Sequence, residues 1–544
     1  MSGTGKASRV SQEEVAAAFA RNAGNIRATA KELGIARSTV RDKLTPLGMM
    51  KKPLVGGTKL GVEAEVVKLP KRGGIKRFII TSAQNNTYVH QELLVNLEAL
   101  AEHYGAEIIV GTYSYNQNAY GPQSVKRDTW RAKAKKGAYD KDLWYDPKIT
   151  KYIKDFRMNL GKGLVWAGEY NALPTNVNPL AGLEAYTGRS SAIFPHAKLA
   201  MRSIPTMQGE GVKLNYTTGT ITQRNYIQKR EGVIAEFHHI YGALLVEVNS
   251  DGNWWVRQLN QDEGTGTLQD LDVLVKDGVV TTGNAVEALT FGDLHGTMAD
   301  PTVVELSHEM TEVLRPKYQF LHDVMEGVSV NPHDRKYKNN HVKFHTWLRG
   351  LHRVRTELET TAALLKTYTK DGVKTVIVDS NHDNPWMVRW LSEYDYRVDP
   401  ANAELFLKLQ TQMYSEIRSG KMPRDINMIE YALNDAGLNG AAKFLIADES
   451  YLICDRKIEC GMHGHLGPGG RRGSPDNLSK LARKANTAHT HSCGIYNGLY
   501  VAGTSSKLRW DYATGPSSWS NTHIITYPNG KRTLVTIYNG KWRA

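Results

Sequence analysis

The sequence predicts a multi-domain α/β protein with a small all-helical module at its N-terminus. Three observations lead to this expectation. The chain has 544 residues, which is too long for one hydrophobic core. Short apolar runs followed by stretches of helical periodicity recur through the second half of the chain, and three closely spaced helical segments occupy residues 1–48.

The composition is that of a globular protein with an excess of positive charge. Charged residues make up 23% and hydrophobic residues 41% of the chain, and the net charge of +14 favours a polyanionic partner. The three cysteines, Cys454, Cys460 and Cys493, are too few for a disulfide framework and are expected to be buried. No apolar run approaches the roughly 18–20 residues of a membrane span. We therefore expect a soluble, cytoplasmic protein with no membrane partner.

Residues 1–48 have the spacing of a helix-turn-helix. Apolar positions predict helices at about 15–19, 26–33 and 38–44, and Gly34 supplies the tight turn between the last two. The stretch 25–44 resembles the helix-turn-helix of Fis-like proteins and of small transposase or resolvase DNA-binding domains; a three-helix protein-interaction module is the alternative. In this resemblance the recognition helix would carry the DNA-binding residues Arg37, Ser38, Thr39, Arg41 and Lys43.

Positive charge is concentrated at this end of the chain. Residues 1–77 hold 16 Lys and Arg against 6 Asp and Glu, so they carry +10 of the net +14. Charge located in this way favours contact with DNA phosphates. Residues 49–74, with Lys51, Lys52 and two Gly-Gly pairs, are predicted to form a basic flexible linker.

A mixed α/β domain is predicted over residues 75–284, as a platform for substrate or for oligomerisation. A strand at 76–82, a helix at 90–103 and a strand at 107–112 form a β-α-β unit, which implies a parallel sheet. No glycine-rich loop follows the first strand, so a dinucleotide site is disfavoured. Residues 243–259 predict a hairpin. The sequence does not identify the fold of this region.

Two features of this domain have both structural and functional interpretations. Basic residues alternate with aromatic residues between positions 126 and 145, up to Trp144 and Tyr145, which suits nucleic-acid binding or a solvated loop with anchoring aromatics. His238 and His239 would point to opposite faces of a strand, so we expect structural roles for them rather than ligation of one metal ion.

Five clusters of metal-ligand residue types lie between residues 293 and 491. Three of them follow predicted strands at 285–291, 318–321 and 375–379. Sites in open α/β sheets form at the carboxyl ends of such strands, and residues two apart at a strand end can share one metal ion. The clusters are Asp293 with His295, Asp323, Asn381-His382-Asp383, His463 with His465, and His489 with His491.

The order of these clusters resembles that of the calcineurin-like metallophosphoesterases, and the resemblance covers residues 285–544. This superfamily includes Ser/Thr phosphatases, cyclic-nucleotide phosphodiesterases and SbcCD-type DNA exonucleases. The resemblance implies a four-layer α/β/β/α domain with two metal ions bridged by Asp323. The implied ligands of the first ion are Asp293, His295 and His491, and those of the second are Asn381, His463 and His489. His382 would be the general acid and Asp383 would orient it.

The chain departs from the superfamily's pattern at three glycine positions, which are His322, Ser380 and Ala488 here. No ligand is lost, so activity is still expected. His465 is an alternative to His463, which we prefer because it comes first after a predicted strand at 458–462.

Other segments are expected to surround the site. A helical cap is predicted at about 399–436, and a β-rich tail after His491 is predicted to complete the second sheet. Residues that could contact a substrate phosphate are His333, Arg335, His341, His345, Arg471 and Arg472.

The donor types predict the cofactor and the chemistry. Mixed Asp, Asn and His ligands suit two ions of Mn(II), with Fe or Zn as alternatives, better than all-oxygen Mg(II) or Ca(II) sites. Two such ions bind a phosphate's oxygens and lower the pKa of a bridging water, and His382 can protonate the leaving oxygen. Two-metal phosphoester hydrolysis is the expected reaction.

The leading functional hypothesis is a metal-dependent DNA nuclease, with DNA held by the helix-turn-helix. The arrangement is similar to that of DNA-degrading or DNA-repair nucleases of large tailed phages, which would place it in the host cytoplasm. A phosphatase or nucleotide phosphodiesterase localised by its DNA-binding module is one alternative, and a DNA-binding regulator with a vestigial metal site is another. The sequence leaves open a homo-oligomer, a further protein partner, and the choice between endonuclease and exonuclease.

Overall fold

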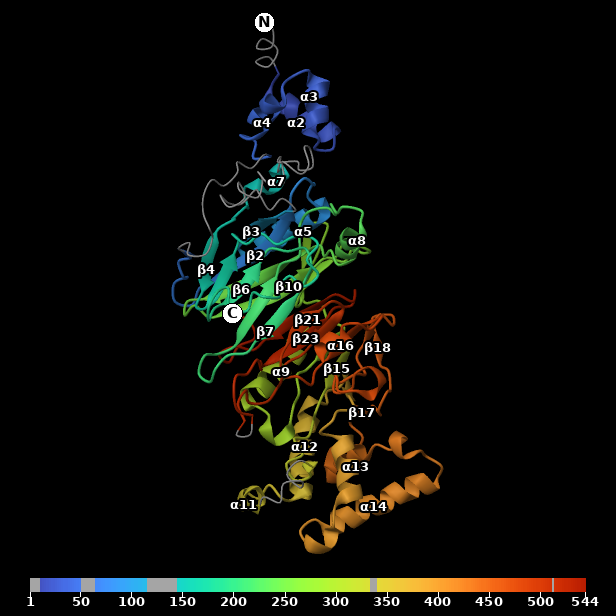
Figure 1. The fold of residues 1–544 in the computed structure, drawn as a ribbon. Coiled ribbons are helices and arrows are strands. Elements are labelled where there is room, and N and C mark those ends of the chain that lie inside the picture. The colour runs from blue at the N-terminus through green and yellow to red at the C-terminus, as the bar shows by residue number, and fades with distance from the viewer. Residues whose placement is uncertain (1–9, 50–63, 115–143, 333–339, 511–512) are drawn as a thin grey trace.

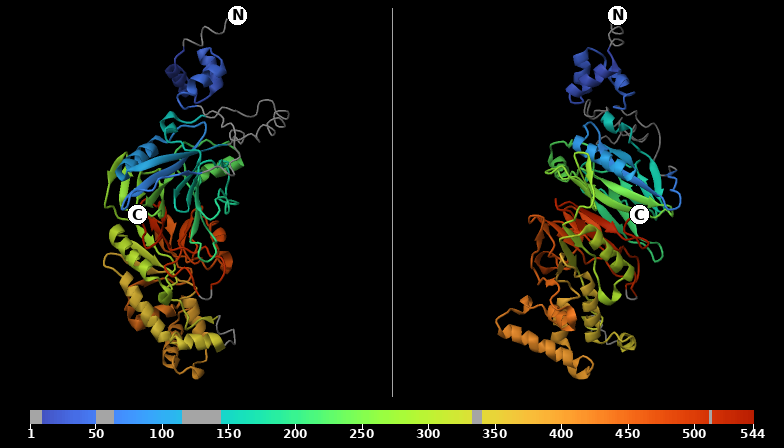
Figure 2. Two further views of the ribbon diagram at one scale, coloured as in Figure 1. Left: turned by 90° about the vertical axis from the view of Figure 1, so that its left-hand side faces the viewer. Right: turned by 180° about the vertical axis from the view of Figure 1, so that it is seen from behind.

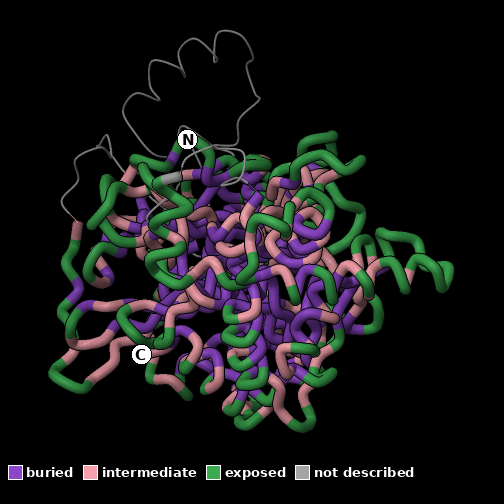
Figure 3. The backbone as a smooth tube through the Cα atoms, turned by 90° about the horizontal axis from the view of Figure 1, so that it is seen from below, coloured by how far each residue is buried: buried purple, intermediate pink, exposed green. Residues whose placement is uncertain are grey.

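The computed structural model describes residues 10–49, 64–114, 144–332, 340–510 and 513–544. Figure 1 shows a helical module at one end, followed by stacked β-sheets with helices on their outer faces. The strands of the described residues form sheets of 11, six, four and three strands. Buried residues lie through the middle of the molecule and exposed ones at its periphery (Figure 3). The mixed α/β class with an N-terminal helical module is thus confirmed.

The N-terminal module consists of α2 (Gln12–Arg21), α3 (Ile26–Leu33) and α4 (Arg37–Leu44). Ser11 begins α2 with a capping box, and Gly34 ends α3 with a left-handed φ of 65°. Its core contains Phe19, Val40 and Leu44, and the distant Trp144 completes it. The expected order of helix, turn and helix is present.

The largest sheet contains strands from both halves of the chain, in the order β1-β4-β5-β6-β8-β7-β21-β22-β20-β19-β18. The strands from the first half are β1 (Glu65–Val66), β4 (Arg157–Gly161), β5 (Leu164–Ala167), β6 (Ser191–Phe194), β7 (Met201–Ile204) and β8 (Lys213–Thr217). Those from the second half are β18 (Leu452–Ile453), β19 (Ile458–Glu459), β20 (Lys484–Thr487), β21 (Gly494–Tyr496) and β22 (Leu499–Val501). The two sets join where β7 pairs with β21.

A four-stranded sheet of order β10-β9-β2-β3 packs on the first half of the large sheet. Its strands are β2 (Ile75–Gln84), β3 (Ala106–Tyr113), β9 (Gly242–Asn249) and β10 (Trp254–Asn260). Phe78 and Ile80 face the large sheet, whereas Ile79 faces the helix α5 (Gln91–Tyr104) on the outer side. The predicted β-α-β unit and hairpin are confirmed.

The remaining elements of the first half are short. They are α7 (Pro147–Thr150), α8 (Arg230–Phe237), and a three-stranded sheet of β11 (Leu268–Asp270), β12 (Val273–Lys276) and β13 (Val279–Thr281). This small sheet contacts α5 and β10.

A six-stranded sheet of order β17-β16-β15-β14-β23-β24 packs on the second half of the large sheet. Its strands are β14 (Ala288–Thr290), β15 (Tyr318–Leu321), β16 (Lys374–Ile377), β17 (Lys443–Phe444), β23 (Thr522–Thr526) and β24 (Arg532–Thr536). Strands β14 to β17 are parallel, and the hairpin β23–β24 lies antiparallel beside β14.

Helices cover the outer face of this sheet around Leu289, Leu321 and Ile377. The α-helices of this half are α9 (Pro301–Leu314), α11 (Asn340–Leu348), α12 (Val354–Tyr368), α13 (Asn384–Glu393), α14 (Ala403–Arg418), α15 (Met428–Leu433) and α16 (Pro475–Leu478). Five further short helical segments are η2 (Gly296–Met298), η3 (Tyr396–Val398), η4 (Pro423–Asp425), η5 (Asn434–Leu438) and η6 (Pro468–Gly470).

The predicted boundary between residues 284 and 285 does not separate two independent cores. The 11-stranded sheet crosses it, and Tyr216 from the first half shares one buried cluster with Ile495 and Leu534 from the second. Backbone hydrogen bonds between distant strands produce this continuity, and local sequence patterns do not report them.

Several local expectations differ from the structure. Helical periodicity over 343–368 predicts one long helix, but the structure breaks it between α11 and α12, where Gly350 has a φ of 70°. Part of the predicted linker is the strand β1, which pairs with β4, while residues 50–63 lie outside the described residues. The tail is β-rich as expected, but β23 and β24 extend the six-stranded sheet instead of completing the second one.

The predicted cap and the end of the predicted basic loop both form packed structure. Helix α14 packs on α13 and α15, where Phe406 contacts Trp390 at 5.1 Å between ring centroids, and a capping role stays a prediction. Trp144 and Tyr145 are buried, so neither is a surface for base stacking. Residues 115–143 lie outside the described residues. Among the residues placed, no helix is long and apolar enough to cross a membrane.

Candidate metal centre

The clusters predicted from the sequence converge at one edge of the two sheets of the second half. Asp293 and His295 follow β14, Asp323 follows β15, and Asn381 and His382 follow β16. His463 follows β19, and His489 and His491 follow β20. Three groups of close donor atoms result. Two consist of predicted ligands, which are Asp293 with His295 and His491, and Asp323 with His463 and His489; the third is His295 with Glu326 and His382.

The first group is tightly packed. Asp293 Oδ2 lies 3.1 Å from His491 Nε2, and His295 Nε2 lies 2.9 Å from the same His491 atom. All three side chains are buried, and Ser505 N–H donates to the backbone oxygen of Asp293 at 2.8 Å. One carboxylate oxygen and two imidazole nitrogens thus face a common point.

The second group adjoins the first through Asp323. Its Oδ2 lies 3.2 Å from His463 Nε2 and 3.9 Å from His295 Nε2, so this carboxylate stands between the two groups. Asn381 Oδ1 lies 3.1 Å from His463 Nε2. His465 is only half-buried and is not part of either group, so the geometry favours His463 over His465 as the ligand.

Four of these residues have strained backbones. The φ values are 51° for His295, 41° for Asp323, 73° for His489 and 56° for His491. Left-handed conformations cost about 1–3 kcal/mol at non-glycine residues and cluster at functional sites. The fold therefore holds these donors together at a local cost.

The donor set fits divalent metal ions. Burial alone would raise the pKa of Asp293, but the charge of His463 and the hydrogen bond of His491 outweigh it and hold this pKa well below its usual range. Nδ1 of His489 and Nδ1 of His491 are buried with no hydrogen-bond partner among the described residues. Ionised carboxylates beside imidazole nitrogens are the ligands of Mn(II), Fe or Zn.

His382 lies at the rim of the two groups. Its Nδ1 is 2.8 Å from the backbone oxygen of Glu326, and its ring stacks on Trp386 with centroids 3.9 Å apart. The predicted orienting role of Asp383 is wrong, because its carboxylate accepts hydrogen bonds from the backbone N–H groups of Val324 and Met325 instead. Asp383 fixes the loop after β15, and the Glu326 carbonyl orients His382.

Sequence reasoning missed three kinds of neighbour. Glu326 Oε2 lies 2.9 Å from His295 Nδ1, and this contact outweighs burial and raises the pKa of His295 to about 9. Trp510 and Trp519 pack edge-on against His491, with ring centroids 5.3 and 4.4 Å away. His322, which the sequence placed beside Asp323 but gave no role, stacks on His463. Only Glu326, three residues after Asp323, had a usable signal.

Other predicted residues have varied environments. Arg472 lines a pocket of about 480 Å³ together with His489 and Thr490, whereas His341 and His345 are exposed on α11. His333 and Arg335 lie outside the described residues.

The three cysteines are buried and free, and burial raises the pKa of Cys454 to about 11. His238 and His239 lie at the end of α8, not in the expected strand, and the ring of His239 bonds to Tyr226 and the Thr222 carbonyl.

The N-terminal helices present the expected surface. On α4, Arg37, Ser38 and Arg41 are exposed, and Thr39 and Lys43 are partly exposed. Residues 7–45 match the family model described as "Bacterial regulatory protein, Fis family". The fold and the site thus define an α/β protein with an N-terminal helix-turn-helix and clustered His, Asp and Glu side chains that could bind metal ions.

A relative from a bacteriophage covers most of the chain. Over 483 residues the chain is 38% identical to "Protein A1" of Escherichia phage T5. The matched region covers 86% of this chain and 83% of that protein. The chain therefore belongs to the family of phage T5 Protein A1. No solved structure matches it significantly.

Proposed function

We propose that this protein is a two-metal-dependent DNA nuclease of the calcineurin-like type, with a four-layer α/β/β/α catalytic region. The observation that carries the proposal is the convergence of two donor groups joined by Asp323 at one strand-end edge. Since its relative is a phage protein, it would act in the cytoplasm of an infected host.

The ligands would divide between two ions. Asp293, His295 and His491 would hold one ion, Asn381, His463 and His489 the other, and Asp323 both. When bound, such ions bind phosphate oxygens and lower the pKa of a shared water; Mn(II) is the proposed metal.

His382 is the group placed to move a proton. Because its Nδ1 is engaged by the Glu326 carbonyl, that nitrogen carries hydrogen, and Nε2 is left to exchange a proton with a substrate oxygen. Trp386 fixes the plane of the ring. His382 would protonate the leaving oxygen of the cleaved phosphodiester.

DNA is favoured as the substrate by the helix-turn-helix, since the metal centre alone suits any phosphoester. A phosphatase or nucleotide phosphodiesterase localised to DNA has the same donor set and is the second candidate. A DNA-binding regulator with a vestigial site is less favoured, because no ligand is missing.

Incubation with Mn(II) and plasmid, linear or single-stranded DNA, beside para-nitrophenyl phosphate, separates these candidates. We expect DNA cleavage, and we expect His382→Ala to lower kcat by about 10²–10⁴-fold, the usual contribution of general acid catalysis. Asp371→Asn, on an exposed turn, is the matched control. Hydrolysis of the small ester with DNA untouched would refute the nuclease, and DNA binding without hydrolysis of either would indicate the regulator.

A further inference from the structure

The two halves of the chain repeat one topology. In the first half, β2 and β3 are parallel and joined by α5, and the hairpin β9–β10 lies antiparallel beside β2. In the second half, β14 and β15 are parallel and joined by α9, and the hairpin β23–β24 lies antiparallel beside β14. Each strand of one set has a counterpart in the other, in the same order along the chain.

The large sheet repeats in the same way. The run β4-β5-β6-β8-β7 has antiparallel, parallel, parallel and antiparallel neighbours. The run β18-β19-β20-β22-β21 has the same four relations, including the exchanged order of its last two strands. The repeat covers seven strand pairings and one helical connection, and chance agreement over all eight is implausible for open sheets, where many orders are allowed.

Hydrogen bonds repeat at the level of single atoms. After β8, the Thr220 hydroxyl and the Ile221 N–H both donate to the backbone oxygen of Ser82, each at 2.8 Å. After β22, the Thr504 hydroxyl and the Ser505 N–H both donate to the backbone oxygen of Asp293, each at 2.8 Å. Ser82 therefore occupies the place of Asp293.

Equivalent strands also contact each other across the centre. Strand β7 pairs antiparallel with its counterpart β21, and β10 packs on its counterpart β24, where Gln258 bonds to Thr533 and Leu534. Contacts of like with like are the mark of a two-fold arrangement. Figures 1 and 2 show the two halves on either side of this centre.

We infer that residues 75–260 (the N-unit) and residues 285–544 (the C-unit) are two copies of one α/β unit, that only the C-unit keeps a metal centre, and that the N-unit carries the DNA-binding helices on its corresponding edge. The chain is thus built like a two-fold dimer with one end that cuts DNA and one end that anchors it. The cutting role rests on the proposed function; the duplication does not.

The N-unit has lost the metal ligands. Ser82 stands for Asp293, and Thr112 stands for Asp323, since Thr112 N–H bonds to Asp155 much as Asp323 N–H bonds to Ser380. Among the described residues, every group of three close metal-ligand atoms lies in the C-unit.

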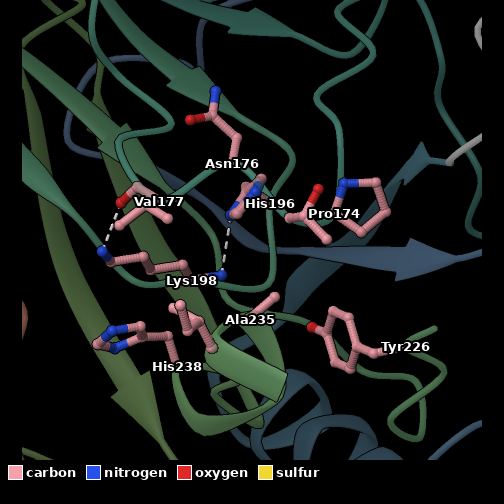
Figure 4. A pocket seen from close by; sticks show the side chains of 10 residues that line it. Pro174, Asn176, Val177, His196, Lys198, Tyr226, Ala235 and His238 are labelled. Carbon is pink, nitrogen blue, oxygen red and sulfur yellow. Dashed lines mark hydrogen bonds between the residues drawn. The ribbon is translucent and has the colours of Figure 1, made fainter. Parts of the chain in front are cut away.

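The corresponding edge of the N-unit carries other side chains. His196 and Lys198 follow β6 as His489 and His491 follow β20, and Figure 4 shows them in a small pocket beside Tyr226 and His238. Lys198 Nζ donates to the Val177 carbonyl. The pocket holds about 10 Å³, which is room for one water molecule and not for two metal ions and a phosphate.

The helix-turn-helix is fixed to this same edge. The loop after β2, which corresponds to the loop after β14 at the metal centre, holds Trp144 by two hydrogen bonds with Asn86. Trp144 also contacts Phe19 of α2 and Tyr88, with ring centroids 5.2 and 4.9 Å away. Figure 1 shows the DNA-binding helices at the outer end of the N-unit, so the N-unit lies between them and the C-unit, which holds the metal centre.

One short DNA segment cannot reach both ends. A compact chain of 544 residues is about 60 Å across, whereas a 12-base-pair duplex is only about 40 Å long. DNA of about 1,000 base pairs far exceeds the persistence length of about 150 base pairs and can loop between the two ends. The helix-turn-helix should therefore assist cleavage of long DNA alone.

The first test counts metal ions on the intact chain. Titration with Mn(II) alone should give two ions per chain, and Asp323→Asn should abolish tight binding while Thr112→Ala leaves the count at two. Four ions per chain, or loss of ions in Thr112→Ala, would overturn the assignment of a single metal centre.

The second test compares DNA lengths. The double variant Arg37→Ala, Arg41→Ala removes two exposed charges and should raise KM for the long duplex about 10-fold or more at low salt, with KM for the 12-base-pair duplex unchanged. An equal rise for both lengths would show that the two ends share one segment and would overturn the inference.

Failure of the proposed function gives a different result. If no DNA is cleaved, the number of 12-base-pair duplexes bound per chain still decides the inference. Two duplexes bound to the native chain and one bound to the double variant would support two DNA-contacting ends. One duplex bound to the native chain and none bound to the double variant would refute them.

Discussion

The N-unit and the C-unit show how one fold can serve two purposes. Their strands pair in the same order, and the Thr220 and Thr504 hydroxyls each donate to an equivalent backbone oxygen. What differs is the strand-end edge, where Ser82 and Thr112 stand in one unit and Asp293 and Asp323 in the other. The scaffold depends on backbone pairing, and the chemistry depends on a few side chains at its edge.

The space around the two edges differs accordingly. In the C-unit a pocket of about 480 Å³ opens beside His489, with Arg472 on its wall. In the N-unit the pocket beside His196 is about 10 Å³, and a larger pocket of about 550 Å³ lined by Lys198 and Arg202 holds no group of three close metal-ligand atoms among the described residues. The helical module is attached nearby through Trp144. An edge without ligands is free to become a docking surface.

The largest expected effect comes from substituting Asp323 and its counterpart Thr112 by alanine. Asp323→Ala should lower activity more than the 10–100-fold that is usual for residues that merely support a ligand, because Asp323 contacts both donor groups. Thr112→Ala, its counterpart, should leave activity within about twofold. Steady-state kinetics with Mn(II) would measure both, and an equal loss in the two variants would break the comparison.

A buried ion pair of the N-unit should make the stability of the chain depend on acid pH. In the N-unit Arg257 bonds to buried Glu247 and Asp270. Burial alone would raise the pKa of Glu247, but Arg257 and Arg77 outweigh it and lower this pKa to about 2. A carboxyl with a depressed pKa stabilises the fold above its unfolded pKa, near 4.5, and this stability is lost as the pH falls from about 4.5 to about 2.

The Glu247 carboxylate should contribute on the order of 3 kcal/mol to the free energy of unfolding. Glu247→Gln should therefore make this free energy fall less steeply as the pH is lowered. Urea unfolding between pH 2 and 6 would measure it. Glu263→Gln, an exposed carboxyl near the same sheet, is the control and should not change the slope. Unaltered acid sensitivity in Glu247→Gln would contradict the assigned role.

Removing a residue that supports a metal ligand should have a smaller effect on activity. Glu326→Gln removes the charge beside His295 Nδ1, and the loss of such a partner typically costs 10–100-fold in metal affinity or activity. Competition with a Mn(II) chelator would measure the affinity. Unchanged affinity would show that Glu326 is only a packing residue.

The smallest expected effect comes from the equivalent threonines of the two units, Thr504 and Thr220. Thr504→Val and Thr220→Val each remove a buried hydrogen bond to a backbone oxygen, together with hydrogen bonds to Ser506 or Thr222, at a cost of about 1 kcal/mol per bond in the free energy of unfolding. Only Thr504→Val should also lower activity, because its partner is the backbone of Asp293. Equal activity losses in both variants would argue against a metal centre in the C-unit alone.

Local patterns in the sequence determined the helix-turn-helix and the position of the donor clusters. Strand β15 begins and ends as expected, and the Asp300 cap and Pro301 begin α9, because such signals act over a few residues. The Gly34 turn and the exposed basic face of α4 followed in the same way.

Only the tertiary structure decided how the halves combine. The repeat is not visible in the sequence, because it is held by pairings between distant strands while its ligands and loop lengths have diverged. The same reason applies to Trp144, which fills the core of a module more than 90 residues earlier, and to the carbonyl of Glu326, which orients His382 where Asp383 was expected. Contacts between residues far apart in the chain depend on the shape of the folded molecule, and no local pattern encodes them.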